Sequence, residues 1–174
     1  AGPLISNNIQ RIVKGRITHM ARKNHYILVG MGSLAQNVYK GLTERGEHVT
    51  VVCPPGSPHD LPEKADIIEG DTSAVSTLKL AGANEAKYIV VLSESDAENV
   101  FVILAAKEVA GDDTQIIALV NETQNMAKVK RVNPTMVLSL PLLGSELLVR
   151  TLQGDAINND LITEMFFGKR TSLG

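Results

Sequence analysis

The chain has 174 residues, 44% of them hydrophobic and 21% charged, so it is long enough to bury the core of one globular domain. Aromatic residues make up 3%, tryptophan is absent and the net charge is −2, a combination that argues against a nucleic-acid-binding protein. No apolar run approaches the roughly 20 residues that a membrane-spanning helix needs.

Residues 1–24 form a basic arm. They contain five lysines and arginines and no acid, whereas the rest of the chain has 12 basic and 19 acidic residues. A basic segment ahead of an acidic domain suits a position near an anionic surface such as the cytoplasmic face of a membrane. A solvated arm would carry the same charge, so both interpretations stay open.

Short apolar runs alternate with amphipathic stretches through the rest of the chain. We expect strands at 25–30, 48–53, 65–70, 87–92, 115–120 and 135–140, and helices at 33–45, 73–82, 96–111, 123–132 and 142–153. Strands rich in valine and isoleucine that alternate with helices are typical of a parallel sheet covered on both faces. The sequence therefore predicts an α/β, Rossmann-like doubly wound domain over 25–154, with six parallel strands in the order 3-2-1-4-5-6. Residues 155–174 form a polar tail.

The stretch ILVGMGSLAQNVYKGL, residues 27–42, contains a Gly-x-Gly-x-x-Ala turn between the first strand and the first helix. Gly30 allows a tight turn, Gly32 lets a ligand approach the backbone, and Ser33 and Leu34 begin a helix whose N–H groups can meet a phosphate. The second strand ends at Cys53, where dinucleotide-binding proteins carry an acid for the ribose hydroxyls. The turn therefore predicts an adenine nucleotide site or only close helix packing, and it favours packing over NAD.

Catalytic chemistry is not indicated. The four histidines show no metal-ligand spacing, and about 30 residues after the last predicted strand leave no room for a substrate-binding domain. Cys53 is the only cysteine, so no intramolecular disulfide forms and a reducing compartment is indicated. We therefore predict no catalytic residue, no metal site, and a packed free thiol at Cys53.

The stretch EGDTSAVSTLKLAGANEAKYIVVLSESDAENVFVILAAKE, residues 69–108, resembles the RCK domain (regulator of K⁺ conductance, also called KTN or TrkA-N). The similarity lies in the Gly70-Asp71-Thr72 motif, in the Leu-x-x-Ala-Gly-x-x-x-Ala pattern of residues 78–86, and in residues 93–96 with Asn99. It covers roughly residues 22–154. It implies a regulatory domain that assembles as a homo-oligomer (a dimer, a tetramer or a ring) and gates K⁺ conduction when a ligand binds.

The segment GPLISNNIQRIVKG, residues 2–15, is similar to the linker after the last pore helix of Kch-type bacterial voltage-gated potassium channels. That resemblance implies a pore-forming transmembrane part upstream, and a cytoplasmic domain of an inner-membrane protein. A soluble Trk/Ktr-type regulatory subunit is the alternative, although a free subunit needs no pore linker. A NAD-dependent oxidoreductase fragment and a ligand-free scaffold are further alternatives.

The resemblance also implies two sets of functional residues. The regulatory ligand, a nucleotide or another molecule, would be held by Gly30, Gly32, Ser33, Leu34, Asp71, Thr72, Ser93 and Asp96. The assembly interface would use Asn99, Phe101, Val102, Leu104, Ala105 and Met126. For about half of the interface set the alternative is burial in the chain's own core, and for Asp71 and Thr72 it is helix capping. The helix at 142–153 is similar to a crossover helix that leads to a C-terminal lobe in longer relatives.

Calcium is not expected at the site that calcium-gated relatives use. Asp96 matches the first acid of that site, but the two other acidic positions are Leu119 and Asn121. Because Ca²⁺ prefers six to eight oxygen ligands that include several carboxylates, this set is too poor in charge. Asp96 is instead predicted to be an N-cap or a first-turn acid of its helix.

Overall fold

A computed structural model describes residues 22–154 of the chain. Most of the predicted arm (1–21) and the predicted tail (155–174) lie outside the described residues. The sheet consists of β1 (Tyr26–Val29), β2 (Val49–Cys53), β3 (Asp66–Glu69), β4 (Tyr88–Val91), β5 (Gln115–Val120) and β6 (Met136–Ser139). Its order is β3-β2-β1-β4-β5-β6, and every neighbouring pair is parallel. The predicted fold class and strand order are confirmed.

The helices are α2 (Ser33–Glu44), α3 (Val75–Leu80), α4 (Asp96–Val109), α5 (Met126–Arg131) and α6 (Leu140–Leu152). Two 3₁₀ turns, η1 (Ala83–Glu85) and η2 (Thr123–Asn125), precede β4 and α5. The helix predicted at 123–132 therefore becomes α-helical only at Met126. Gly82 follows α3 with φ of +77°, the left-handed conformation that glycine adopts without strain, and thus ends that helix as predicted.

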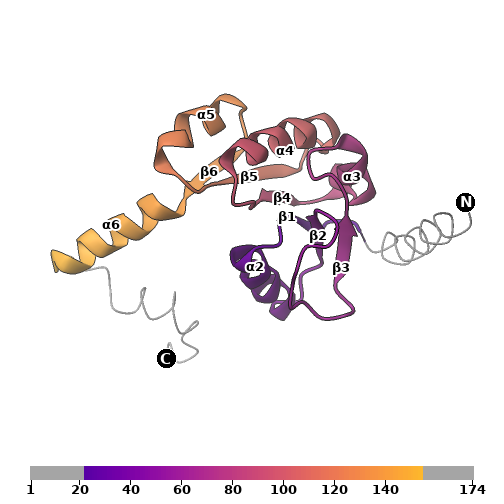
Figure 1. The fold of residues 1–174 in the computed structure, drawn as a ribbon, viewed down its shortest axis with the longest axis horizontal. Helices are drawn as coiled ribbons and strands as arrows, with labels where there is room; N and C mark the ends of the chain where they lie inside the picture. The colour runs from indigo at the N-terminus through magenta and orange to yellow at the C-terminus, as the bar shows by residue number, and fades with distance from the viewer. Residues whose placement is uncertain (1–21, 155–174) are drawn as a thin grey trace, which may run out of the picture.

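Helices cover both faces of the sheet (Figure 1). On one face α3, α4 and α5 pack over a core that includes Ile27 and Val29 of β1, whereas α2 packs on the other face against Leu28. Adjacent residues of a strand point to opposite faces, so β1 is buried on both sides. This double burial explains why the first strand is apolar without alternation.

The last helix, α6, extends away from the sheet (Figure 1). None of its residues is buried, and all its leucines and its valine except the half-buried Leu147 are between 41% and 74% exposed. The neighbouring edge strand β6 also exposes Met136 and Leu138. The predicted helix at 142–153 thus forms, but none of its residues is buried against the rest of residues 22–154. That part of the chain contains no helix that is both long and apolar enough to cross a membrane.

Arg22 joins the end of the arm to the sheet. Its side chain is 3% exposed, and its guanidinium donates hydrogen bonds to both carboxylate oxygens of Asp66, at 2.6 and 2.8 Å. A third hydrogen bond, of 2.8 Å, goes to the carbonyl of Leu80 at the end of α3. The Thr50 hydroxyl donates to Asp66 Oδ2 at 2.7 Å. The buried ion pair therefore has the additional hydrogen bonds that a desolvated pair requires.

Replacing Arg22 would leave Asp66 as an uncompensated carboxylate. We expect Arg22→Ala to lower the free energy of unfolding by about 3 kcal/mol, since removal of one partner of a buried pair costs roughly 3–5 kcal/mol. Arg150→Ala is the matched control, because Arg150 and Glu146 form an exposed pair one turn apart on α6. That change should cost about 0.3 kcal/mol. Urea denaturation measures both, and equal losses would contradict the prediction.

Candidate functional site

The carboxyl ends of β1 and β4 meet at the point where the strand order reverses, which is where doubly wound sheets bind ligands. Gly30 lies here with φ of +134°, and its N–H donates to the carbonyl of Val52 at 2.9 Å. A Cβ on Gly30 would lie 3.1 Å from the carbonyl atoms of Leu92. Only glycine fits this position, because the backbones after β1 and after β4 approach each other so closely.

The N-terminus of α2 faces the same edge. Gly32 is its N-cap residue, with no side-chain hydrogen bond to the helix, and the first turn contains no acid. A Cβ on Gly32 would meet only the side chain of Glu94, whose Oε1 would be 3.0 Å away. Ser33 is exposed beside it, whereas the Leu34 side chain packs against the core on the α2 face. Leu34 can therefore offer a ligand its backbone N–H but little of its side chain.

Gln36 holds this glycine turn in place, and the sequence analysis missed it. Its Nε2 donates to the carbonyl of Met31 at 2.9 Å, and its Oε1 accepts from the N–H of Asp60 at 3.0 Å. The turn after β1 is thereby tied to the loop between β2 and β3. A polar residue on an amphipathic helix is indistinguishable from a solvent-facing one in the sequence, so no local signal could have identified this role.

Asp71 and Thr72 follow β3 at the same edge, and each forms hydrogen bonds to other described residues. Asp71 Oδ1 accepts hydrogen bonds from the hydroxyl and the N–H of Ser73, and these bonds lower the pKa of Asp71. The Thr72 hydroxyl donates to Glu98 at 2.9 Å and is buried. The N-cap residue of α3 is Ala74, without a side-chain cap. Neither residue therefore caps α3, and only Asp71 is exposed to a ligand.

Asp96 accepts four hydrogen bonds from the segment after β5. Its donors are the N–H and Nδ2 of Asn121, the N–H of Glu122 and Nδ2 of Asn125, at 2.7 to 3.0 Å. Burial alone would raise the pKa of Asp96, but the four donors outweigh it and the pKa lies below its usual value. Ser95, whose hydroxyl accepts from Glu98 N–H, is the N-cap of α4, so Asp96 is the first-turn acid.

Asp96, Leu119 and Asn121, the three positions compared above with the calcium site of relatives, make other contacts in this structure. Both carboxylate oxygens of Asp96 face N–H donors, Leu119 is buried, and Asn121 directs its amide nitrogen rather than its oxygen at Asp96. Within residues 22–154, no three His, Cys, Asp or Glu side chains are grouped as metal ligands. In this arrangement Asp96 stabilises a loop.

Ser93 and Asn99 connect the loops after β4 and β5. The Asn99 side chain accepts from the Ser93 N–H and donates to the Ser93 carbonyl, and its amide also approaches the carbonyl of Leu119 at 3.4 Å. Asn121 donates to the same Ser93 carbonyl at 2.9 Å. Because Asn99 is fully buried, it is a structural residue within this chain and has no surface for a partner.

The predicted interface residues divide into two groups. Val102 and Ala105 are buried in the core beneath α4, and Met126 packs partly against that core. Phe101 and Leu104 are 62% and 46% exposed on the outer side of α4. The predicted interface is therefore corrected for Asn99, Val102 and Ala105, which are in the core because α4 lies directly on the sheet.

Cys53 is buried at the end of β2, opposite Glu69 in the register with β3. Burial raises the pKa of its thiol, with a smaller contribution from Glu69. The thiol is therefore protonated at neutral pH and is packed, which agrees with the prediction of a packed free thiol.

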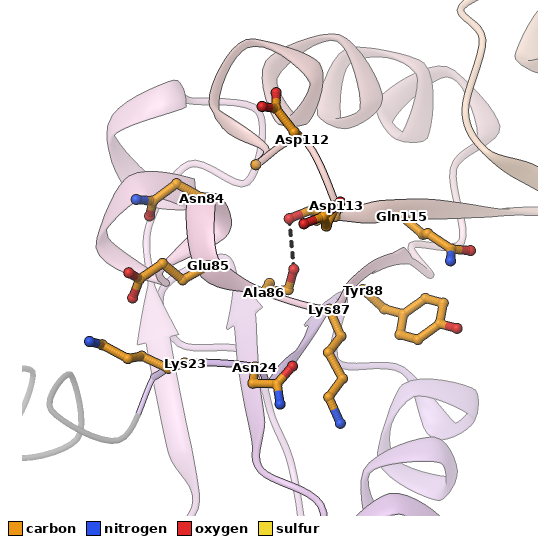
Figure 2. A pocket seen from close by; sticks show the side chains of 12 residues that line it. Lys23, Asn24, Asn84, Glu85, Ala86, Lys87, Tyr88, Asp112, Asp113 and Gln115 are labelled. Atoms are coloured by element: carbon orange, nitrogen blue, oxygen red, sulfur yellow. Dashed lines mark hydrogen bonds between the residues drawn. The ribbon is translucent and has the colours of Figure 1, made fainter.

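A hollow of about 670 Å³ lies at the opposite edge of the sheet, where β4 and β5 begin (Figure 2). Lysine and acid side chains both line it: Lys23, Lys87, Glu85, Asp112 and Asp113. None of the ligand residues predicted from the sequence belongs to this lining. The hollow and the glycine turn are thus separate features.

A glycine turn at the reversal point of a six-stranded parallel sheet defines a Rossmann-like domain. The TrkA-N domain family matches residues 26–140, and the chain belongs to this family of RCK domains. It is similar to the voltage-gated potassium channel Kch of Escherichia coli K12, with 40% identity over 172 residues that cover 94% of this chain. The chain spans 40% of the length of that relative.

Solved structures share the fold. The Kef CTD of Shewanella denitrificans in AMP-bound form has a TM-score of 0.64 at 20% identity, covering 76% of this chain and 83% of that one. GsuK bound to ADP has a TM-score of 0.63 at 21% identity, covering 82% of this chain and 38% of that one.

Asp96 should stabilise the folded chain in a pH-dependent way. We expect Asp96→Ala to lower the free energy of unfolding by about 3 kcal/mol, because four donors lose a charged acceptor. The folded-state pKa lies below the unfolded value of about 3.9, so the contribution is complete above pH 4 or so and is lost as the pH falls through the folded pKa.

Denaturant titrations of wild type and variant between about pH 7 and pH 2 measure this difference, within the range where the wild type still folds. Asp112→Ala, in the exposed loop before β5, is the control and should leave stability unchanged. A difference between wild type and Asp96→Ala that stays constant into the acid range would contradict the assigned role.

Proposed function

We propose that the chain is the cytoplasmic regulatory domain of a potassium channel of the inner membrane, joined to a pore-forming part of the same protein. The observation that carries this proposal is the 40% identity to Kch over nearly the whole chain. The basic arm of residues 1–24 supports it, because such a segment suits a connector near anionic lipid headgroups. In this role the domain binds and assembles and catalyses nothing.

The regulatory ligand proposed is an adenine nucleotide at the Gly30–Gly32 turn. The uncapped N-terminus of α2 supports a phosphate there, because its N–H groups are free to donate. The AMP-bound and ADP-bound forms of the structural relatives agree with this ligand class. Glu94 lies over Gly32 and Asp71 is exposed at the same edge, so a nucleotide of low charge, or one accompanied by a cation, is favoured over free ATP.

A ligand at this turn would contact the loops after both β1 and β4. Movement of Glu94 away from Gly32 would displace the segment 93–96, which Asn99 and Asn121 tie to α4 and to the loop after β5. Ligand binding would therefore be transmitted to the helix that carries Phe101 and Leu104. This connection provides a physical route from the nucleotide to the assembly surface.

Assembly is proposed to use the outer side of α4. Phe101 and Leu104 expose large apolar side chains there, and Leu80 of α3, a helix that packs beside α4, is 52% exposed. Met126 at the start of α5 is partly buried at the border of this surface. A second copy of the chain that covers these residues would remove the apolar area from water.

A nucleotide bound at about 100 times its dissociation constant should stabilise the domain by about 2.7 kcal/mol, a rise in Tm of roughly 5–10 °C. We expect this shift with at least one of AMP, ADP, ATP and NAD in a thermal-denaturation series, and its loss in Gly32→Val. The variant should still fold, since Gly32 has an ordinary φ of −68° and its new side chain would meet only the movable end of Glu94.

Gly41→Ala, further along α2, is the matched control and should keep the shift, because its Cβ would make only an ordinary contact with Arg45. Glu94→Gln should strengthen the binding of ATP more than the binding of AMP if the carboxylate repels phosphate charge. Absence of a shift with every nucleotide in both wild type and Glu94→Gln would contradict the nucleotide proposal.

Phe101→Asp and Leu104→Asp should each weaken self-association at least tenfold, because burial of one large apolar side chain contributes roughly 1.5–3 kcal/mol. Analytical ultracentrifugation over a concentration series measures the dissociation constant against the monomer mass of 18.7 kDa. Asn37→Asp adds the same charge to the exposed side of α2 and should have no effect. A wild-type chain that is monomeric at all concentrations would contradict assembly through α4.

A further inference from the structure

His25 is buried at the point where the arm enters the sheet. It directly precedes β1, is 1% exposed, and places Nε2 2.8 Å from the carbonyl oxygen of Ala81. Its Nδ1 is a buried polar atom with no hydrogen-bond partner among the described residues. The ring lies against Gly82, where a Cβ would come within 3.1 Å of Cε1.

Arg22 and His25 hold the same end of α3. The Arg22 guanidinium donates to the carbonyl of Leu80 while His25 bonds the carbonyl of the next residue, Ala81. Terminal carbonyls of a helix lack partners within the helix and carry partial negative charge, so two cationic or donor side chains satisfy them. We call Arg22, His25 and Asp66 the latch, because together they fasten the end of the arm to α3 and β3.

The latch requires a neutral His25. A carbonyl oxygen only accepts, so Nε2 carries the hydrogen and Nδ1 is left as a bare acceptor. A proton on Nδ1 would be a buried donor without an acceptor. The charged or titratable groups that face the ring are Arg22 and His48, which lower the pKa of His25, and Asp66, which raises it. The Asp66 carboxylate already accepts from Arg22 and Thr50.

We propose that the latch is a proton-sensitive switch, which opens when His25 takes up a proton and so frees residues 22–25 from the end of α3. The stimulus is the proton itself. It acts on the two contacts that hold the end of the arm, from Arg22 to Leu80 and from His25 to Ala81. The opening of the latch does not depend on the proposed function. Its expected consequence, a change in the coupling between the domain and the pore, does rest on the proposed function.

The direction of the pH effect follows from linkage. Burial lowers the pKa of His25 in the closed latch below its ordinary value of 6.5, and with the charge of Arg22 it outweighs the hydrogen bond to Ala81, which raises the pKa. In an open latch the ring is solvated and its pKa returns towards 6.5. The open state therefore binds more protons. The closed latch has its full stability above about pH 6.5 and loses stability as the pH falls from there towards the lowered pKa.

Amide hydrogen exchange, resolved by NMR on the chain without nucleotide, tests the proposal. The N–H of Asn24 donates to Glu85 and the N–H of Lys87 donates to His25, so both report on the segment that the latch holds. Between about pH 7.5 and pH 5, their protection factors should fall by up to tenfold per pH unit below 6.5. The Leu92 N–H, bonded to Val29 inside the sheet, should keep its protection.

His25→Gln keeps a donor for Ala81 but cannot be protonated, so the protection of Asn24 and Lys87 should become independent of pH. His59→Gln replaces an exposed histidine that is not among the groups facing the ring, and it should behave like wild type. The same pH dependence in His25→Gln, no dependence in wild type, or a parallel loss at Leu92 would each overturn the proposal.

A direct titration covers the case in which His25→Gln does not fold. The Cε1–H resonance of His25 in the wild-type chain should titrate below pH 6.5, together with the loss of protection at Asn24. Titration at or above 6.5 would overturn the proposal. Because neither measurement involves a nucleotide or a pore, failure here would leave the channel assignment standing, and failure of nucleotide binding would leave the switch standing.

Discussion

β1 pairs with β4 in parallel, with Val29 opposite Val91, and the chain leaves both strands at the same edge of the sheet. The two backbones then approach so closely that a Cβ on Gly30 would lie 3.1 Å from Leu92. Every feature of the candidate site depends on this pairing. It brings the turn after β1 beside the segment that starts α4, and it aims the N-terminus of α2 at the same space. A shift of one residue in register would turn the buried side chains of β1 to the opposite faces.

Hydrogen bonds between loops, rather than apolar packing, hold the rest of this edge. Asp96 fixes the segment after β5, Asn99 fixes Ser93, and Gln36 fixes the glycine turn. These groups are satisfied within the chain. Gly32 and the first turn of α2 differ from them, because only Glu94 lies over that position. The edge therefore combines a hydrogen-bonded frame with the first turn of α2, where we propose that the ligand binds.

The domain also leaves apolar surface uncovered in two places. One is the outer side of α4 at Phe101 and Leu104, and the other is α6 with the adjoining edge strand. The latch at Arg22 and His25 anchors the other end of the described chain.

The sequence by itself determined the fold and the location of the turn. Valine-rich strands, helix-stop glycines and the Gly-x-Gly-x-x-Ala spacing are local patterns, and each was sufficient to predict its element to within a few residues. The motifs around Gly70 and Ser93 were also sufficient to predict the family. These features could be predicted because backbone conformation and hydrophobic periodicity are set by residues close together in the chain.

Only the tertiary structure decided what individual side chains do. Arg22 and Asp66 are 44 residues apart, and Asp96 finds its partners 25 to 29 residues away. The apolar residues of α4 divide into core and surface according to where the sheet lies, since that helix is apolar on more than one side. Side-chain partners depend on distances across the fold, and no local pattern records them.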